Sequence, residues 1–145
     1  MQIEHIFDAD LQFRPDMEAL DSADGRDGEL IGSGDGEVRG KLNGKLRWTA
    51  FENAHGDFCD VNLPGLIETD DGAKIPFDAK GYSIRVGDGE WKHGLVLKFS
   101  PSDKRYAWLA VDGTTAFCVG EFNEATGRAA WRVHGHSVAA EVAAA

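Results

Sequence analysis

The chain has 145 residues, 42% of them hydrophobic, and its 25 acidic residues against 15 basic ones give a net charge of −10. This length suits one domain that folds around its own core. The negative charge repels phosphate backbones and anionic membranes, so we expect no nucleic acid and no membrane as partner. No apolar run approaches the ~18 residues of a spanning helix, and no export signal is evident, which together predict a cytoplasmic location.

The first half of the chain shows the two-residue alternation of half-buried strands. Residues 3–13 form one such run. The glycine-rich and acidic segment 14–35 is expected to be a long loop, in which Leu30 and Ile31 could form a short strand. Two further runs follow in 36–52, joined by Asn43-Gly44, a strong hairpin signal.

The second half continues this pattern without any segment that predicts a helix. Residues 58–69 and 73–84 are expected to pair around the turn at Asp70-Asp71-Gly72, where both aspartates serve as turn formers. Regularly spaced short strands predict an all-β fold, a sandwich or a single up-and-down antiparallel barrel. We assign residues 1–137 to this one domain and expect 138–145 to be a frayed tail. The later predicted strands are 94–99, 105–111, 115–122 and 128–133.

Three stretches carry a resemblance to a known family. They are Trp48 with the run that precedes it, the turn TDDGA at 69–73 and the segment RYAWL at 105–109. On these motifs the chain resembles the bacterial family called domain of unknown function 3237. The resemblance implies a compact, calycin-like antiparallel β-barrel and brings no agreed activity. The chain departs from the family pattern at Arg47, where the pattern has aspartate, and at Ala110, where it has asparagine.

Polar residues on the apolar phase of a strand are the candidate catalytic groups. By alternation His5 shares a face with Phe7, and Glu121 shares a face with Phe117. Arg85 shares the inward phase of Ile75 and Phe77 if no bulge intervenes at Gly81, and it is then expected to be the partner of Glu121. An imidazole or carboxyl in an apolar interior shifts its pKa towards the neutral form and can exchange protons near neutral pH, and an arginine can hold a developing anion.

Trp48, Tyr106 and Trp108 are the candidate ligand-binding residues, because each combines an apolar ring with one polar atom. His93 is expected to be a solvated residue at a strand start. Cys59 and Cys118 fit no metal-ligand spacing and predict buried free thiols. The spacing of potential ligands predicts neither a metal nor a cofactor.

Two classes of function follow from this pattern. In the first, the barrel binds an aromatic or polyketide-like small molecule and isomerises, cyclises or eliminates on it by acid–base chemistry, without a cofactor. In the second, the same barrel only binds or carries its ligand. A homo-oligomerising module with a filled interior is a third alternative.

Overall fold

We describe the protein from a computed structural model, which covers residues 3–25, 27–110 and 114–137. The tail predicted for 138–145 lies outside these described residues. No helix in the described ranges is long and apolar enough to cross a bilayer. The elements in chain order are β1 Glu4–Phe13, β2 Glu18–Asp21, β3 Gly28–Gly40, β4 Gly44–His55, β5 Phe58–Thr69, β6 Lys74–Gly87, β7 Glu90–Phe99, the 3₁₀ helix η1 Lys104–Ala110, β8 Thr114–Asn123 and β9 Arg128–Ser137.

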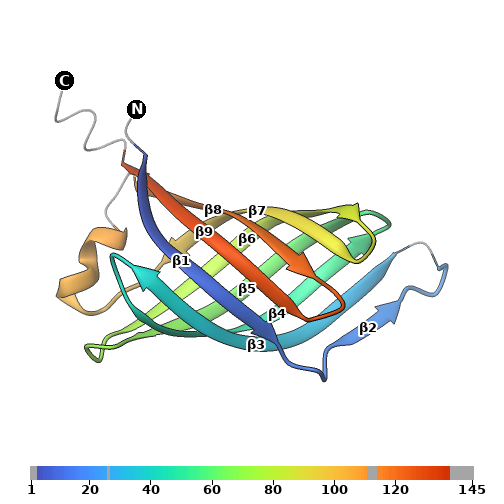
Figure 1. The fold of residues 1–145 in the computed structure, drawn as a ribbon, viewed down its shortest axis with the longest axis horizontal. Coiled ribbons are helices and arrows are strands. Elements are labelled where there is room, and N and C mark those ends of the chain that lie inside the picture. The colour runs from blue at the N-terminus through green and yellow to red at the C-terminus, as the bar shows by residue number, and fades with distance from the viewer. Residues whose placement is uncertain (1–2, 26, 111–113, 138–145) are drawn as a thin grey trace.

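The strands form one antiparallel sheet that closes on itself (Figure 1). The order β1-β9-β8-β7-β6-β5-β4-β3 is completed by β1 pairing with β3, from Phe7 with Gly40 to Phe13 with Gly34. Eight strands therefore make a closed barrel, and its interior is just wide enough for side chains or one small ligand. The predicted all-β antiparallel barrel is confirmed.

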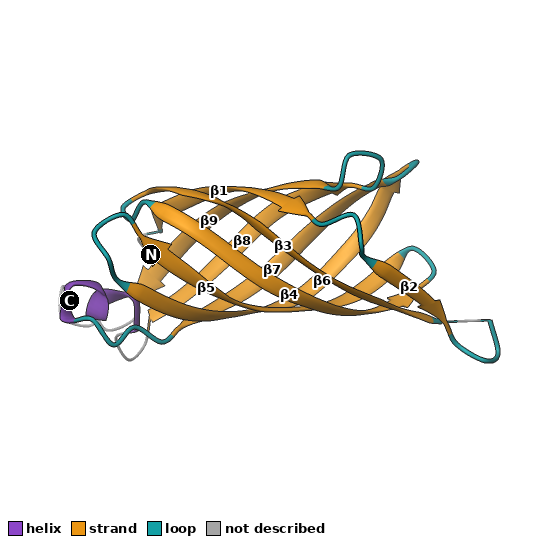
Figure 2. Cartoon of the chain, turned by 90° about the horizontal axis from the view of Figure 1, so that it is seen from below, coloured by secondary structure: helices purple, strands orange, loops and turns teal. Residues whose placement is uncertain are grey.

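The segment predicted as a long acidic loop is largely a hairpin. β2 pairs with the start of β3, beyond the point where β1 leaves the ring, so the hairpin extends one end of the barrel (Figure 2). Leu30 and Ile31, singled out as a strand fragment, belong to this first part of β3. β3 and β4 form the predicted hairpin, but Gly44 is already the first residue of β4 and pairs with Val38, so residues 41–43 make the connection. The predicted turn at Asp70-Asp71-Gly72 is present, and Gly72 has the positive φ of 91° that such a turn favours.

The prediction of a strand at 105–111 is wrong, because residues 105–110 belong to η1. The side chain of Asp103 starts the helix by accepting a hydrogen bond from the backbone N–H of Arg105 at 2.9 Å. Tyr106 and Leu109 are three residues apart, lie on one side of the 3₁₀ helix and are buried. β7 and β8 pair directly with each other, so no strand edge is free between them for a further strand.

Two of the three motifs of the family resemblance, at 69–73 and 105–109, meet where η1 lies, at one end of the barrel (Figure 2). Tyr106 donates a hydrogen bond from its hydroxyl to Asp71 Oδ2 at 2.7 Å, and Arg105 lies 3.2 Å from the same oxygen. Thr69 donates to the other carboxylate oxygen, and these hydrogen bonds lower the pKa of Asp71. Asp71 is therefore more than a turn former, since it connects the β5–β6 turn to η1. We call the end of the barrel that carries η1 the closed end.

Candidate functional site

The end of the barrel opposite η1 holds a cavity of about 390 Å³. This volume suits one small organic molecule. The lining is mainly apolar and includes residues from the β2–β3 hairpin, which places the cavity at the end where β2 lies (Figure 1). Flat aromatic walls favour aromatic ligands. The phenylalanine and tryptophan side chains in the lining are Phe13, Trp48, Trp91, Phe122 and Trp131.

Trp48 forms one wall of the cavity, as predicted from its place on β4. Its ring packs edge-on against Phe13 with centroids 5.1 Å apart. Gly34 on the paired strand makes room for this ring, because a Cβ at position 34 would collide with it. The indole Nε1 is buried and has no hydrogen-bond partner among the described residues. An unpartnered buried N–H is costly, and a ligand acceptor would satisfy it.

Glu52 is the carboxyl group that lines the cavity from β4. It lies on the same inward phase as Trp48 and Ala50. Burial alone raises its pKa to about 7, with no opposing contribution from a cation. The charge of Glu52 also contributes, after burial, to raising the pKa of Cys59 to about 11, which places the two groups near each other. Glu52 is therefore present in both protonation states near neutral pH.

His93 lines the cavity from β7 and is not the solvated residue that the sequence predicted. Its Nε2 is buried without a partner among the described residues. Burial lowers its pKa to about 4, although the charge of Glu121 opposes this, so the imidazole is neutral at pH 7. Gly120 on β8 allows the ring to lie there, since a Cβ at that position would stand 2.5 Å from Nε2.

Arg85 faces the cavity as predicted, but its partners differ from the predicted Glu121. Its guanidinium lies 3.1 Å from Asp57 Oδ1 and 3.6 Å from Glu124 Oε1, and it stacks 4.5 Å above the ring of Trp91. The indole N–H of Trp91 donates to Glu124 at 2.6 Å. These contacts hold one side of the cavity mouth in place and leave the arginine charge compensated.

The β2–β3 hairpin forms the other side of the mouth. Met17 lies against Gly32 and lines the cavity. In the turn of the hairpin, Asp27 lies 2.9 Å from His55, which also lies 3.2 Å from Asp60, so His55 links the turn to β5. The hydrogen bond to Asp27 is the main cause that raises the pKa of His55.

The structure corrects the predicted position of His5. A β-bulge between His5 and Phe7 shifts the register of β1 against β9, so that Ile6 and Phe7 are both buried. Because of this bulge, His5 does not share the inward face of Phe7, as strict alternation had predicted. The imidazole points outward and lies 2.8 Å from Asp8.

Glu121 also lies outside the barrel, contrary to the prediction. β8 has apolar residues on both phases, and the inward phase is that of Ala116 and Cys118. Val119 is exposed on the outer face beside Glu121, which lies 3.4 Å from Arg132. Phase alone could not identify the inner face of this strand.

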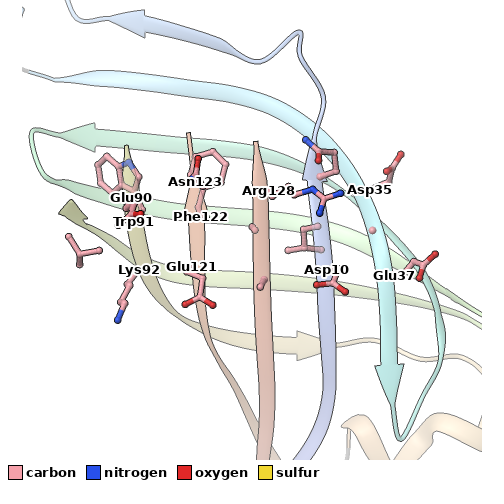
Figure 3. Close-up of a pocket in the computed structure, with 16 residues that line it drawn as sticks. Asp10, Asp35, Glu37, Glu90, Trp91, Lys92, Glu121, Phe122, Asn123 and Arg128 are labelled. Carbon is pink, nitrogen blue, oxygen red and sulfur yellow. The ribbon is translucent and has the colours of Figure 1, made fainter. Parts of the chain in front are cut away.

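A second depression, of about 710 Å³, includes Glu121 in its lining. Figure 3 shows its residues spread over neighbouring strands, among them Asp10, Glu37, Lys92 and Arg128. The depression is wide and carries charges of both signs. The smaller cavity is the stronger candidate, because its ionisable groups are buried and their pKa values are shifted as those of functional groups often are.

Tyr106 and Trp108, both predicted to bind ligand, lie on η1 at the closed end. The Tyr106 hydroxyl is engaged by Asp71, and Trp108 is 39% exposed. Neither lines the cavity. Their positions follow from the 3₁₀ helix that replaced the predicted strand.

Two cavity residues were missed, although the sequence contains a signal for each. Glu52 is four residues from Trp48 and therefore has the same strand phase, and His93 has the phase of Trp91 and Leu95.

Within the described ranges, no group of three histidine, cysteine or acidic side chains is placed to hold a metal ion.

Comparison with known proteins supports the fold. No protein-family model and no curated protein matches the sequence. A protein of unknown function from Clostridium acetobutylicum has 18% identity and a TM-score of 0.81 over 94% of this chain and 100% of that chain. A conserved protein of unknown function from Rhodopseudomonas palustris has 16% identity and a TM-score of 0.78, covering 92% and 96%.

An enzyme from Penicillium herquei also shares the architecture, with 21% identity and a TM-score of 0.64 over 91% of this chain and 93% of that chain. At identities this low the similarity shows the fold alone. Membership of the domain of unknown function 3237 family stays a prediction from the sequence motifs. The chain is thus similar to small β-barrel proteins from bacteria and to a fungal enzyme.

Proposed function

We propose that the protein binds an aromatic small molecule in the open-ended cavity and that Glu52 exchanges a proton with it. The observation that carries the proposal is the Glu52 carboxyl, buried in an aromatic-lined cavity with a pKa of about 7. A carboxyl with a pKa near the working pH is an effective general acid or base. The fold neighbour from Penicillium herquei is an enzyme, which supports a catalytic use of such a barrel.

The proposed chemistry is an isomerisation, cyclisation or elimination that uses the chain's own groups. Glu52 as carboxylate accepts a proton from an acidic O–H or C–H of the ligand, and as carboxylic acid it returns the proton to another atom. An isomerisation or cyclisation then leaves the enzyme unchanged. His93 Nε2 and Trp48 Nε1 have no hydrogen-bond partner within the described part of the chain, so both are suited to hydrogen-bond polar atoms of the ligand.

Ligand binding is tested with the neutral fluorescent probe N-phenyl-1-naphthylamine. Ala54→Phe adds bulk to the cavity lining, whereas Ala130→Phe adds the same bulk to the wide depression on the outer face of β9. We expect saturable binding that the first variant weakens at least tenfold and the second leaves within twofold. Absence of saturable binding, or equal effects of the two variants, would contradict the proposed cavity.

Proton transfer is tested with 5-nitrobenzisoxazole, a neutral aromatic compound. A base removes its C3 proton while the N–O bond breaks, which gives a coloured phenolate. We expect the protein to accelerate this reaction at least a hundredfold over acetate at equal concentration, and Glu52→Gln to remove the acceleration while keeping probe binding. Probe binding without acceleration by the unaltered protein would instead indicate a carrier.

A further inference from the structure

Acidic groups surround the cavity from several elements. Glu52 lies in the lining on β4, Asp21 on β2, Glu29 on β3 and Glu124 in the turn after β8. Among the described lining residues Arg85 is the one cation, since His93 is neutral at pH 7. A concave site lined by charge of one sign concentrates ligands of the opposite sign.

The arginine does not reverse this balance. Its guanidinium already faces the carboxylates of Asp57 and Glu124, and its flat side lies over Trp91. A ligand carboxylate at Arg85 would have to displace these partners. The ligand carboxylate would also be repelled by Glu52 whenever Glu52 is ionised.

A ligand cation has the opposite effect. An ammonium group near Glu52 would supply the counter-charge that the buried carboxylate lacks among the described residues. Trp48 and Trp131 belong to the same lining, and the indole ring is the aromatic group that attracts cations most strongly. An uncharged ligand gains neither attraction and suffers no repulsion.

We infer that the cavity selects its aromatic ligand by charge, preferring amines to uncharged compounds and excluding carboxylates. This inference rests on the proposed binding of an aromatic ligand and specifies the class of that ligand. The selecting groups are Glu52 in the cavity and the acidic residues at the mouth.

Three indole derivatives that differ mainly in the charge of the side chain test the inference. Tryptamine is a cation at pH 7, tryptophol is uncharged and indole-3-propionate is an anion. By titration calorimetry we expect tryptamine to bind at least threefold more tightly than tryptophol, and indole-3-propionate at least tenfold more weakly than tryptophol.

Two variants locate the source of the selection. Glu52→Gln should weaken the binding of tryptamine at least threefold and change the affinity for tryptophol less than twofold. Glu68→Gln removes the same net charge from the outer face of β5, near Arg47, and should alter neither affinity. An equal effect of the two variants would mean that net charge rather than Glu52 acts, and would overturn the assignment.

The remaining outcomes separate this inference from the proposed function. If indole-3-propionate binds as well as tryptophol, or tryptamine binds no better than tryptophol, charge selection is refuted while aromatic binding stands. If none of the three binds and the naphthylamine probe also fails, the proposed function falls and this inference with it.

Discussion

Replacing Glu52 by glutamine should stabilise the protein above pH 7 and change its stability little near pH 4.5. Burial raises the pKa of Glu52 from the 4.5 of a free side chain to about 7 in the folded protein. Between these values the folded state holds a proton that the unfolded state has released, so the free energy of unfolding falls as the pH rises. Above pH 7 the full cost of the buried charge is present. Glutamine has nearly the shape of the protonated acid and carries no charge.

The two pKa values set the size of the effect. Each pH unit between them corresponds to about 1.4 kcal/mol, so the interval from 4.5 to about 7 corresponds to about 3 kcal/mol. At pH 8 the glutamine variant should therefore be more stable than the unaltered protein by about 3 kcal/mol. At pH 4.5 the difference should be below about 0.5 kcal/mol, because the folded state is then almost fully protonated and the unfolded state is half protonated.

Urea unfolding at pH 4.5, 6, 7 and 8, followed by tryptophan fluorescence, measures this difference. Glu68→Gln is the matched control, since it removes an exposed carboxylate that lies 3.6 Å from Arg47. An exposed pair of this kind contributes about 0–1 kcal/mol, so the control should show no comparable pH dependence. A Glu52→Gln variant whose stability parallels the unaltered protein at every pH would refute the burial of the charged group.

Three further predictions concern other parts of the barrel. Gly120→Ala places a methyl group against His93 and a backbone carbonyl, and should destabilise the protein by about 1–3 kcal/mol in urea unfolding. Burial raises the pKa of the Cys59 and Cys118 thiols to about 11 and about 12, so a disulfide reagent at pH 8 should react with neither in the native protein and with both after unfolding. Hydrogen bonds lower the pKa of Asp71 in the folded protein below its ordinary value of 3.8. The stabilising effect of Asp71 is therefore fully present above pH 3.8 and is lost as the pH falls through the lower pKa of the folded state. Asp71→Asn should therefore lower the Tm at pH 7 more than at pH 3, and an equal decrease at both would contradict this.

The strand pattern shows where local signals suffice. The β5 strand has the bounds predicted from alternation, β3 and β4 form the predicted hairpin, and the turn at Asp70-Asp71-Gly72 is the predicted one. Such features depend on side-chain phase and turn chemistry within a few residues, which the sequence contains directly. Trp48 and Arg85 face the interior for the same reason.

Alternation does not identify the inner face of a strand when both phases are apolar or when a bulge intervenes. Val119 and Cys118 are adjacent apolar residues on β8, and only the neighbouring strands decide which one is buried. The bulge after His5 depends on how β1 meets β9, a partner more than a hundred residues away in the chain. Glu121 and His5 were misplaced for these two reasons.

Alternation and turn residues predict an all-β fold with short turns, because both act within a few residues of the chain. Closure of the sheet into a barrel depends on the pairing of β1 with β3. The tertiary structure alone decided which end is closed and which polar groups are desolvated together. The closed end arises where Tyr106 meets Asp71, 35 residues apart in sequence. The candidate site arises where Glu52 on β4 and His93 on β7 line one cavity, since burial depends on the whole closed sheet rather than on either strand.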